Sequence, residues 1–418
     1  MSDDQFDSID FFGTKDLIDN PYPYLEHLRG QCPVVKEPHH DVYMVTGYDE
    51  AIEVYHDQET FSACNSAIGP FAKFPVPLEG DDVTEIIETY RDGLPFGDQL
   101  PTFDPPKHTA QRGLLMRLIT PKRLKESEGS LQRLADDQID RFHTRGKCEF
   151  IGEYAQPYTM LVVADLLGVP EEDHPEFLEK LMHHDALEMT HSPLEYLYAQ
   201  FTGYIEDRRR EPRDDVMTGL ATATFPDGSL PPVEDVMKIA SNLFAAGQET
   251  TARLLGTALQ TLGERPDLQQ QLRDDRSLVS PFIEETLRLE PPINGTFRLS
   301  RTPTTVRDTE IPAGSTVMVL PSGANRDPRE FEDPDELRLD RRNARQHIAF
   351  GHGIHTCAGA PLARAESNVS LQRILDRMGE IRISGSHHGP AGARHWEYTP
   401  TWMLRGHDRL YLEFTPID

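Results

Sequence analysis

Helical periodicity dominates the middle of the chain. From residue 107 onward, apolar residues recur at intervals of three and four positions, and breakers rich in proline and glycine separate the runs. The longest run begins at Val233, directly after two prolines, and continues to about Gly263. At 1.5 Å per residue it predicts a helix roughly 45 Å long. We predict the other helices over residues 107–118, 121–143, 149–167, 171–185, 192–209, 213–222, 267–274, 277–290 and 361–378.

Strand-like alternation gathers at the two ends of the chain. Residues 33–46 predict a strand pair around a polar turn, and a short helix follows from Gly47 to His56. Together with the helices, this pattern predicts a mainly α fold with a smaller β region, of α+β class. The later strands are predicted at residues 305–306, 316–320, 380–383, 401–404 and 410–414.

These patterns contain no separable linker, so we expect one domain over residues 1–418. It would hold a β-containing N-terminal part (about 30–65), a helical core (about 105–290 and 361–378) and C-terminal strands (about 380–414).

The stretch 64–103 follows neither the helical nor the strand period and predicts a long loop with one short helix at 83–90. Loops of this length are functional lids or disordered segments. Its apolar residues argue against simple disorder and leave a lid over an apolar pocket, around 71–100, as an open alternative.

Charge and cysteine content narrow the class of protein. Forty-two basic and seventy acidic residues give a formal net charge of −28, which argues against a nucleic-acid partner. Four scattered cysteines are too few for a disulfide framework and favour a reducing compartment. The acidic N-terminus lacks the pattern of a signal peptide, and no run of about 18 apolar residues occurs. We therefore expect a cytoplasmic protein with no membrane partner.

The chemistry concentrates in the loop 346–359, which holds Cys357 and three glycines, Gly351, Gly353 and Gly359. A cysteine just before a helix start lies near unpaired backbone N–H groups, which favour the thiolate. The alternative is a buried cysteine in a tight turn. The glycines favour the first interpretation, because they let the backbone approach a flat or bulky group closely.

Two helical motifs add to this loop. The long helix contains Ala245-Ala-Gly-Gln-Glu-Thr-Thr251, in which an acid beside a hydroxyl is suited to proton delivery. The alternative is structural, because Thr250 can bond a carbonyl one turn back. Glu285 and Arg288 lie three positions apart on another predicted helix and by themselves indicate an ordinary surface ion pair.

Taken together, the motifs Phe350-Gly-x-Gly-x-His-x-Cys-x-Gly359, Ala246-Gly-x-Glu-Thr-Thr251 and Glu285-x-x-Arg288 resemble the cytochrome P450 family of haem-thiolate monooxygenases. Their order and spacing match, and the stretches 104–112, 325–328 and 359–364 resemble those of the soluble bacterial members. The resemblance implies a triangular, helix-rich prism around a buried haem b, bound without covalent attachment. Glu285 and Arg288 then become a structural pair.

By this resemblance, Cys357 is the axial thiolate ligand of the iron, and Phe350 packs near it. A thiolate ligand favours O–O cleavage. The residues that match positions neutralising the haem propionates are His108, Arg112, Arg298 and His355. Gly359 belongs to the same cofactor-binding loop. Two buried carboxylates require cationic or hydrogen-bonding partners.

The resemblance also implies that Glu249 and Thr250 deliver protons during oxygen activation. Glutamate stands where aspartate is the commoner choice. The hydroxyl favours a reaction with O2 and two electrons over a peroxide-driven peroxygenase, which is the alternative. Because no flavin or iron–sulfur motif is present, we expect a ferredoxin and its NAD(P)H-dependent reductase as electron donors. The ferredoxin could dock on a basic patch of arginines, and the alternative is that these arginines are ordinary solvated or propionate-binding residues. They are Arg112, Arg117, Arg345 and Arg364.

The geometry of the family indicates which residues contact the substrate. These residues are mainly apolar, so we expect a hydrophobic substrate, such as a terpenoid, steroid or branched lipid, that is hydroxylated or epoxidised. We expect the enzyme to be a monomer. The residues expected to line its pocket are Asn242, Ala245, Ala246, Ile293, Asn294, Trp402 and Met403. Two interpretations from other classes are a zinc-binding protein that uses His352, His355 and Cys357, and a haem sensor, which would not need Glu249 and Thr250.

Overall fold

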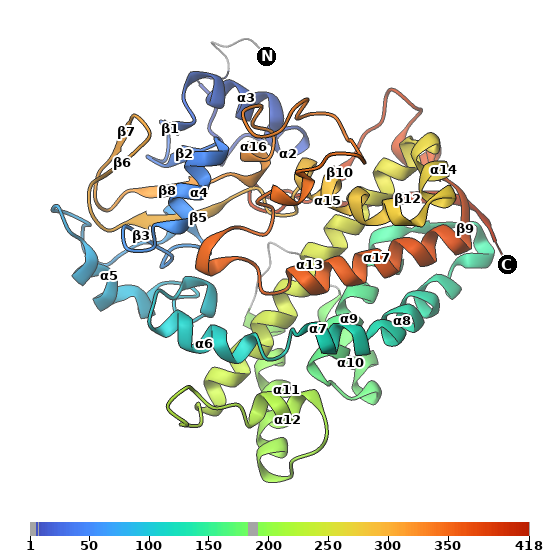
Figure 1. Cartoon of the computed structure of the whole chain (residues 1–418), viewed down its shortest axis with the longest axis horizontal. Coiled ribbons are helices and arrows are strands. Elements are labelled where there is room, and N and C mark those ends of the chain that lie inside the picture. Colours follow the sequence, from blue (N-terminus) through green and yellow to red (C-terminus); the bar gives the residue numbers. More distant parts are fainter. Residues whose placement is uncertain (1–5, 7, 183–190, 418) are drawn as a thin grey trace. The chain divides into compact units, whose positions relative to one another are not determined.

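The structure is a computed structural model that describes residues 6, 8–182 and 191–417 (Figure 1). The chain divides into two compact units, each assembled from separated stretches of sequence. The first consists of Met1–Thr109, Leu287–Cys357 and Pro400–Arg405, and the second of Ala110–Thr286, Ala358–Thr399 and Gly406–Asp418. A single domain over residues 1–418 therefore stays a prediction.

A five-stranded sheet forms the centre of the first unit, in the order β1-β2-β8-β5-β3. The predicted strand pair at 33–46 is confirmed: β1 and β2 are antiparallel, with Val34 opposite Val45. Strand β2 pairs with β8 in parallel, and β5 is antiparallel to β8. The strands of this unit are β1 Val34–Lys36, β2 Tyr43–Val45, β3 Phe61–Ser62, β5 Thr296–Ser300, β6 Thr304–Val306, β7 Thr309–Ile311 and β8 Thr316–Val319.

Strand β5 places Phe297 and Arg298 on opposite faces of the sheet. Successive side chains of a strand point to opposite faces. Phe297 packs in an apolar cluster with Met44 and Met318, while the next residue, Arg298, lies 5.4 Å from the centre of the Tyr55 ring. The sheet therefore presents Arg298 on the face opposite that cluster.

Short helices complete the first unit, and the segment 64–103 is ordered structure that packs against β5. Its predicted helix is confirmed as α5, and Val83, Ile87 and Leu94 are buried with Cys64 and Leu299. The helices of this part, including α6 and α15 at its limits, are α2 Asp16–Asp19, α3 Tyr22–Gln31, α4 Tyr48–His56, α5 Thr84–Tyr90, α6 Lys107–Leu115, α15 Val279–Leu289 and α16 Pro321–Ala324.

The second unit is built around the long helix α13, Val233–Glu264, which packs against α9, α11 and α17 (Figure 1). Its predicted span is confirmed to within one residue. No helix in the described part of the chain is long and apolar enough to cross a bilayer. The other helices of this unit are α7 Pro121–Glu126, α8 Glu128–Asp140, α9 Gln156–Leu167, α10 His174–Leu181, α11 His191–Arg210, α12 Val216–Ala221, α14 Pro266–Asp274, α17 Ala360–Arg377 and α18 Gly385–His388.

Two helix predictions are corrected, one by an interruption and one at its start. The span 121–143 holds two helices, because a new helix begins after Ser127, and Thr120 caps the first by accepting the Arg123 N–H at 3.3 Å. The span 149–167 begins with a π-helical turn, Ile151–Ala155, before α9. Of the helix predicted over 171–185, residues 183–185 lie outside the described residues.

The strands of the second unit form one three-stranded sheet, in the order β4-β12-β9, and one two-stranded sheet. The prediction of a strand at 401–404 is wrong, because this segment forms only one bridge, between Ile293 and Leu404. The prediction also missed β4, whose three residues are too short for a period to be detected. The strands are β4 Lys147–Glu149, β9 Met378–Ile383, β10 Glu397–Tyr398, β11 His407–Arg409 and β12 Tyr411–Pro416.

Candidate active site

Cys357 ends a tight loop in the first unit and is exposed, unlike the buried Cys64 and Cys148. Its N–H donates to the carbonyl of Phe350 at 2.8 Å. Gly353 has a φ of +69°, and a Cβ at this position would collide with the carbonyl of Tyr55. Glycine is therefore required for the loop to lie this close to α4. The interpretation of Cys357 as a buried structural cysteine is wrong.

Two histidines lie together in the same unit. The rings of His108 and His355 are 4.1 Å apart between their centres. His108 is in the first turn of α6, where its N–H donates to the carbonyl of Asp104 at 3.0 Å, and only 2% of its surface is exposed. Arg112 is half-buried four residues later on this helix, and Gly359 directly precedes α17 with an ordinary φ of −77°.

Arg298 is a buried cation, only 6% exposed. Its guanidinium donates to the carbonyl of Phe297 at 2.6 Å, and burial lowers its pKa. Asp104 also acts on it electrostatically, but that carboxylate pairs with Arg91 at 3.1 Å and with Arg301 at 2.6 Å. Within the residues that the structure describes, no carboxylate forms an ion pair with Arg298.

This set of groups fits a haem. An exposed thiol is available to bind iron, and a buried guanidinium with no described carboxylate partner calls for an anion, because a buried charge is costly unless it is paired. The imidazoles of His108 and His355 can donate to the same carboxylates. Each of these residues belongs to the first unit.

In the second unit, Glu249 is held by a partner on its own helix. Arg253, one turn further along α13, donates to the Glu249 carboxylate and also to the hydroxyl of Thr399 at 2.8 Å. The arginine side chain is 6% exposed and that of glutamate is 34% exposed. The sequence prediction missed Arg253, although its spacing from Glu249 was visible.

The neighbouring Thr250 donates to the carbonyl of Ala246 at 3.0 Å, which is the structural bond that its position in a helix allows. The glycine between them has a packing role. A Cβ at Gly247 would lie 2.8 Å from Cγ2 of Val163 on α9. The small residue therefore lets α9 pack closely against this part of α13.

Glu366 is a second residue that the sequence prediction missed. It lies on α17, is 1% exposed, and shares a hydrogen bond with Thr251. Burial raises the pKa of its carboxyl to about 8. A buried acid with a raised pKa beside the Glu249–Thr251 stretch is a candidate functional group.

The Glu285-x-x-Arg288 motif contributes structure. Arg288 is fully buried and donates to the carbonyls of Asn325 at 3.0 Å and Glu336 at 2.9 Å.

Of the arginines considered for a docking patch, Arg364 pairs with Glu284 at 2.7 Å and Arg117 donates to the carbonyl of Thr224 at 3.0 Å. Both contacts are within the second unit.

The residues expected to line a substrate pocket fall into two groups. Asn294 donates from its N–H to the carbonyl of Met403 at 2.7 Å and from its side chain to that of Trp402 at 3.2 Å, and Ile293 bridges to Leu404. The structure therefore brings the first-unit residues together. The second-unit residues lie on successive turns of α13, and they are Asn242, Ala245 and Ala246.

The zinc interpretation gains no support. His352 shares a hydrogen bond of 2.7 Å with His56, between Nδ1 and Nε2. No group of three or more histidine, cysteine, aspartate or glutamate side chains in the described ranges is arranged to hold a metal ion.

Comparisons with known proteins agree on one family. The sequence model described as Cytochrome P450 matches residues 183–378. Cytochrome P450 144 of Mycobacterium tuberculosis is 36% identical over 393 residues, covering 90% of this chain and 87% of that protein. Vitamin D(3) 25-hydroxylase of Pseudonocardia autotrophica is 30% identical and covers 95% and 94%. The substrate-free structure of Mycobacterium marinum cytochrome P450 CYP150A6 is 52% identical, with a TM-score of 0.95 over 99% of this chain and 100% of that one.

Proposed function

This chain belongs to the cytochrome P450 family of haem-thiolate monooxygenases, and on that premise we propose that it hydroxylates or epoxidises a small hydrophobic substrate. The reaction uses O2 and two electrons, and the second oxygen atom leaves as water. The observation that carries the proposal is the set of four first-unit residues, Cys357, His108, His355 and Arg298. Their exposed thiol, paired imidazoles and buried guanidinium match the iron and carboxylates of haem b.

In this proposal Cys357 would hold the haem iron through its thiolate, and the bound haem would supply the chemistry of O–O cleavage. Arg298 and Arg112 would neutralise the propionates, and His108 and His355 would donate hydrogen bonds to them. Phe350 fixes the approach of the thiolate, because its carbonyl already holds the N–H of Cys357. Gly359 continues this loop into α17.

Proton delivery is assigned to Glu249 and Thr250. Arg253 holds the Glu249 carboxylate one turn away, so the carboxylate must leave this guanidinium before it can accept a proton from water. Thr250 donates to Ala246 at rest. To donate elsewhere, the Thr250 hydroxyl would have to rotate about χ1 and give up its bond to Ala246.

The proposed substrate class rests on a relative, and the proposed electron donor rests on the sequence. An apolar molecule of terpenoid, steroid or branched-lipid type agrees with the named activity of the vitamin D(3) 25-hydroxylase relative. The pocket residues named above would contact it. A ferredoxin with an NAD(P)H-dependent reductase is the proposed donor, because the sequence carries no flavin or iron–sulfur motif. We further propose that residues 1–418 act as one monomeric domain.

Isotope incorporation tests this function directly. The holoenzyme is incubated with ferredoxin, reductase, NADPH and a panel of terpenoids and steroids under 18O2, and the products are examined by mass spectrometry. One 18O atom per product, with no product when hydrogen peroxide replaces NADPH, supports the proposal. Product formed equally well from peroxide alone would contradict it and favour a peroxygenase.

A further inference from the structure

The guanidinium of Arg253 joins two separate parts of the second unit. Among the described residues it has two polar partners: the Glu249 carboxylate, one turn back on α13, and the hydroxyl of Thr399, to which it donates at 2.8 Å. The side chain of Arg253 is 6% exposed, and Thr399 is 5% exposed. A planar guanidinium holds both partners at once because its donors point in fixed directions. A shift of either partner therefore disturbs the bond to the other.

The same arginine supports both ends of the loop 400–405. The N–H of Thr399 donates to the carbonyl of Gly406 at 3.1 Å, which closes the loop at its base. A Cβ at Gly406 would lie 2.6 Å from Cγ and 2.7 Å from Cβ of Arg253. Glycine is therefore required for this end of the loop to lie against the stem of the arginine. Thr399 contacts the guanidinium and Gly406 contacts the stem, so the whole base of the loop rests on one side chain.

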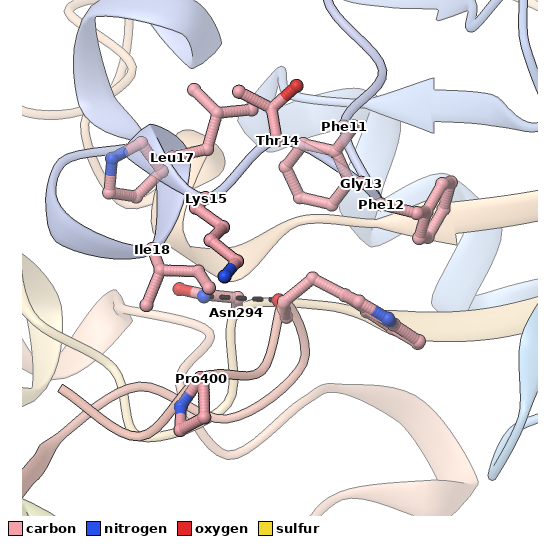
Figure 2. A pocket seen from close by; sticks show the side chains of 11 residues that line it. Phe11, Phe12, Gly13, Thr14, Lys15, Leu17, Ile18, Asn294 and Pro400 are labelled. Carbon is pink, nitrogen blue, oxygen red and sulfur yellow. Dashed lines mark hydrogen bonds between the residues drawn. The ribbon is translucent and has the colours of Figure 1, made fainter.

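The loop 400–405 itself belongs to the first unit and holds two residues expected to contact the substrate, Trp402 and Met403. Asn294 donates to both of their carbonyls, at 2.7 Å to Met403 from its backbone and at 3.2 Å to Trp402 from its side chain (Figure 2). Asn294 and Trp402 also line a cavity of about 200 Å³. The peptide chain connects this loop directly to its base in the second unit. A displacement of the loop therefore acts on the contacts of Arg253 through the chain.

We propose that Arg253 is a positioning residue that links the position of the loop 400–405 to the release of Glu249. The inference rests on the proposed function, in which Glu249 delivers protons and the loop contacts the substrate. While the base of the loop lies on Arg253, the guanidinium holds the carboxylate. A substrate that displaces the loop moves the Thr399 hydroxyl. Because a buried donor without a partner is costly, the guanidinium follows the hydroxyl and loosens its hold on the carboxylate.

Hydrogen–deuterium exchange of the substrate-free holoenzyme tests this link without turnover. The Thr399 N–H is bonded across the base of the loop, so peptides covering residues 397–409 report its opening. Glu249→Gln removes one anchor of Arg253 and should speed this exchange at least about threefold, the scale of coupling within one side-chain network. In a Thr399→Val background the same substitution should have no effect, because the hydroxyl that transmits it is absent. Thr399→Ser keeps the hydroxyl and should preserve the effect.

Two further variants separate the link from general stability. Glu234→Gln breaks an ion pair of the same spacing on α13, with Lys238 at 2.7 Å, and should leave the exchange unchanged. Arg253→Lys keeps the charge but holds only one partner, so Glu249→Gln should add nothing in that background. This comparison remains informative if Thr399→Val does not fold. Equal acceleration by Glu249→Gln in every background, or no acceleration in the wild type, would overturn the proposal.

Substrate affinity separates this inference from the proposed function. Coupling between two sites is reciprocal. A compound of the isotope panel that becomes a product should therefore bind ferric Glu249→Gln holoenzyme more tightly than wild type, by a factor similar to that found in exchange. Equal affinities would show that the substrate does not act on Glu249 through the loop, which would overturn the proposal. If no compound becomes a product, the proposed function fails, and the exchange result still decides the link.

Discussion

Arg253 holds Glu249 on the same helix, one turn away, and its other terminal nitrogen donates to Thr399 at 2.8 Å. The acid assigned to proton delivery is therefore kept in place by a residue that is itself anchored to another segment of the second unit. Its contact has to break and re-form if the acid is to relay protons, which links the local structure of α13 to the proposed chemistry.

Replacing Glu249 by Gln removes the charge and keeps the shape of the side chain. We expect the product formation rate to fall by roughly two orders of magnitude, because general acid–base residues contribute on that scale. Glu234→Gln is the matched control: Glu234 lies on the same helix and pairs with Lys238 at 2.7 Å, also four residues away. In steady-state measurements, the control should form product at a rate near that of the wild type. Equal losses in both variants would show that helix stability, and not proton delivery, was measured.

Thr250→Ala should separate electron use from product formation. Without the hydroxyl, we expect NADPH to be consumed while product per NADPH falls several-fold and hydrogen peroxide rises. Thr250→Ser should restore coupling. Thr261→Ala offers a comparison, since that hydroxyl makes the same bond to a carbonyl one turn back on α13, at 2.9 Å. Unchanged coupling in Thr250→Ala would favour the peroxygenase alternative.

Arg298→Met should have opposite effects on the protein with and without haem. A buried guanidinium with no described carboxylate partner is costly, so its removal should raise the free energy of unfolding of haem-free protein by about 1–3 kcal/mol. Haem affinity should fall, because the propionates lose a cation. Calorimetry and haem titration measure the two effects.

Arg273→Met is the control for this pair of effects. Arg273 is also a cation with a pKa lowered by burial, but it donates to the carbonyls of Leu375 and Met378. Its loss should lower stability without changing haem affinity. The assignment of Arg298 to a propionate would be wrong if both variants bound haem as tightly as the wild type.

Glu366 should make stability depend on pH. Its pKa is raised from 4.5 to about 8 by burial, so the folded protein keeps the carboxyl protonated while the unfolded chain ionises. The contribution to stability is fully present below pH 4.5 and is lost as pH rises through about 8, a decrease of up to roughly 5 kcal/mol.

Glu366→Gln should therefore raise the unfolding free energy at pH 8 and change it little at pH 4.5. Denaturant titrations of both proteins across this range provide the measurement. If the difference in unfolding free energy between the wild type and Glu366→Gln is the same at both pH values, the folded protein does not keep a neutral carboxyl at Glu366.

The sequence predicted the long helix, the mainly α class and the residues of the cysteine loop, because each depends on a local pattern. It did not predict Glu366, since burial of a single acid on α17 depends on the helices that pack over it. The role of Gly247 was likewise hidden, because the contact that needs a glycine comes from Val163, on another helix.

Strand β5 shows a further limit. Its sequence Thr-Phe-Arg-Leu-Ser places a buried arginine between apolar residues, so the alternation of polar and apolar positions does not indicate which face is buried. The role of Arg298 follows from its surroundings, where no carboxylate among the described residues pairs with it. Contacts between segments distant in sequence, and not local propensity, supplied this part of the proposed site.

The central claim is that Cys357 provides a thiolate ligand to a haem, and the reduced, CO-bound absorption spectrum tests it most directly. The wild type should show the strongly red-shifted Soret band of a thiolate-ligated haem, and Cys357→Ala should lose it. Cys64→Ala, which removes a buried cysteine of the same unit, should keep the band. A wild type without the red-shifted band, or a Cys357→Ala variant that retains it, would contradict the account.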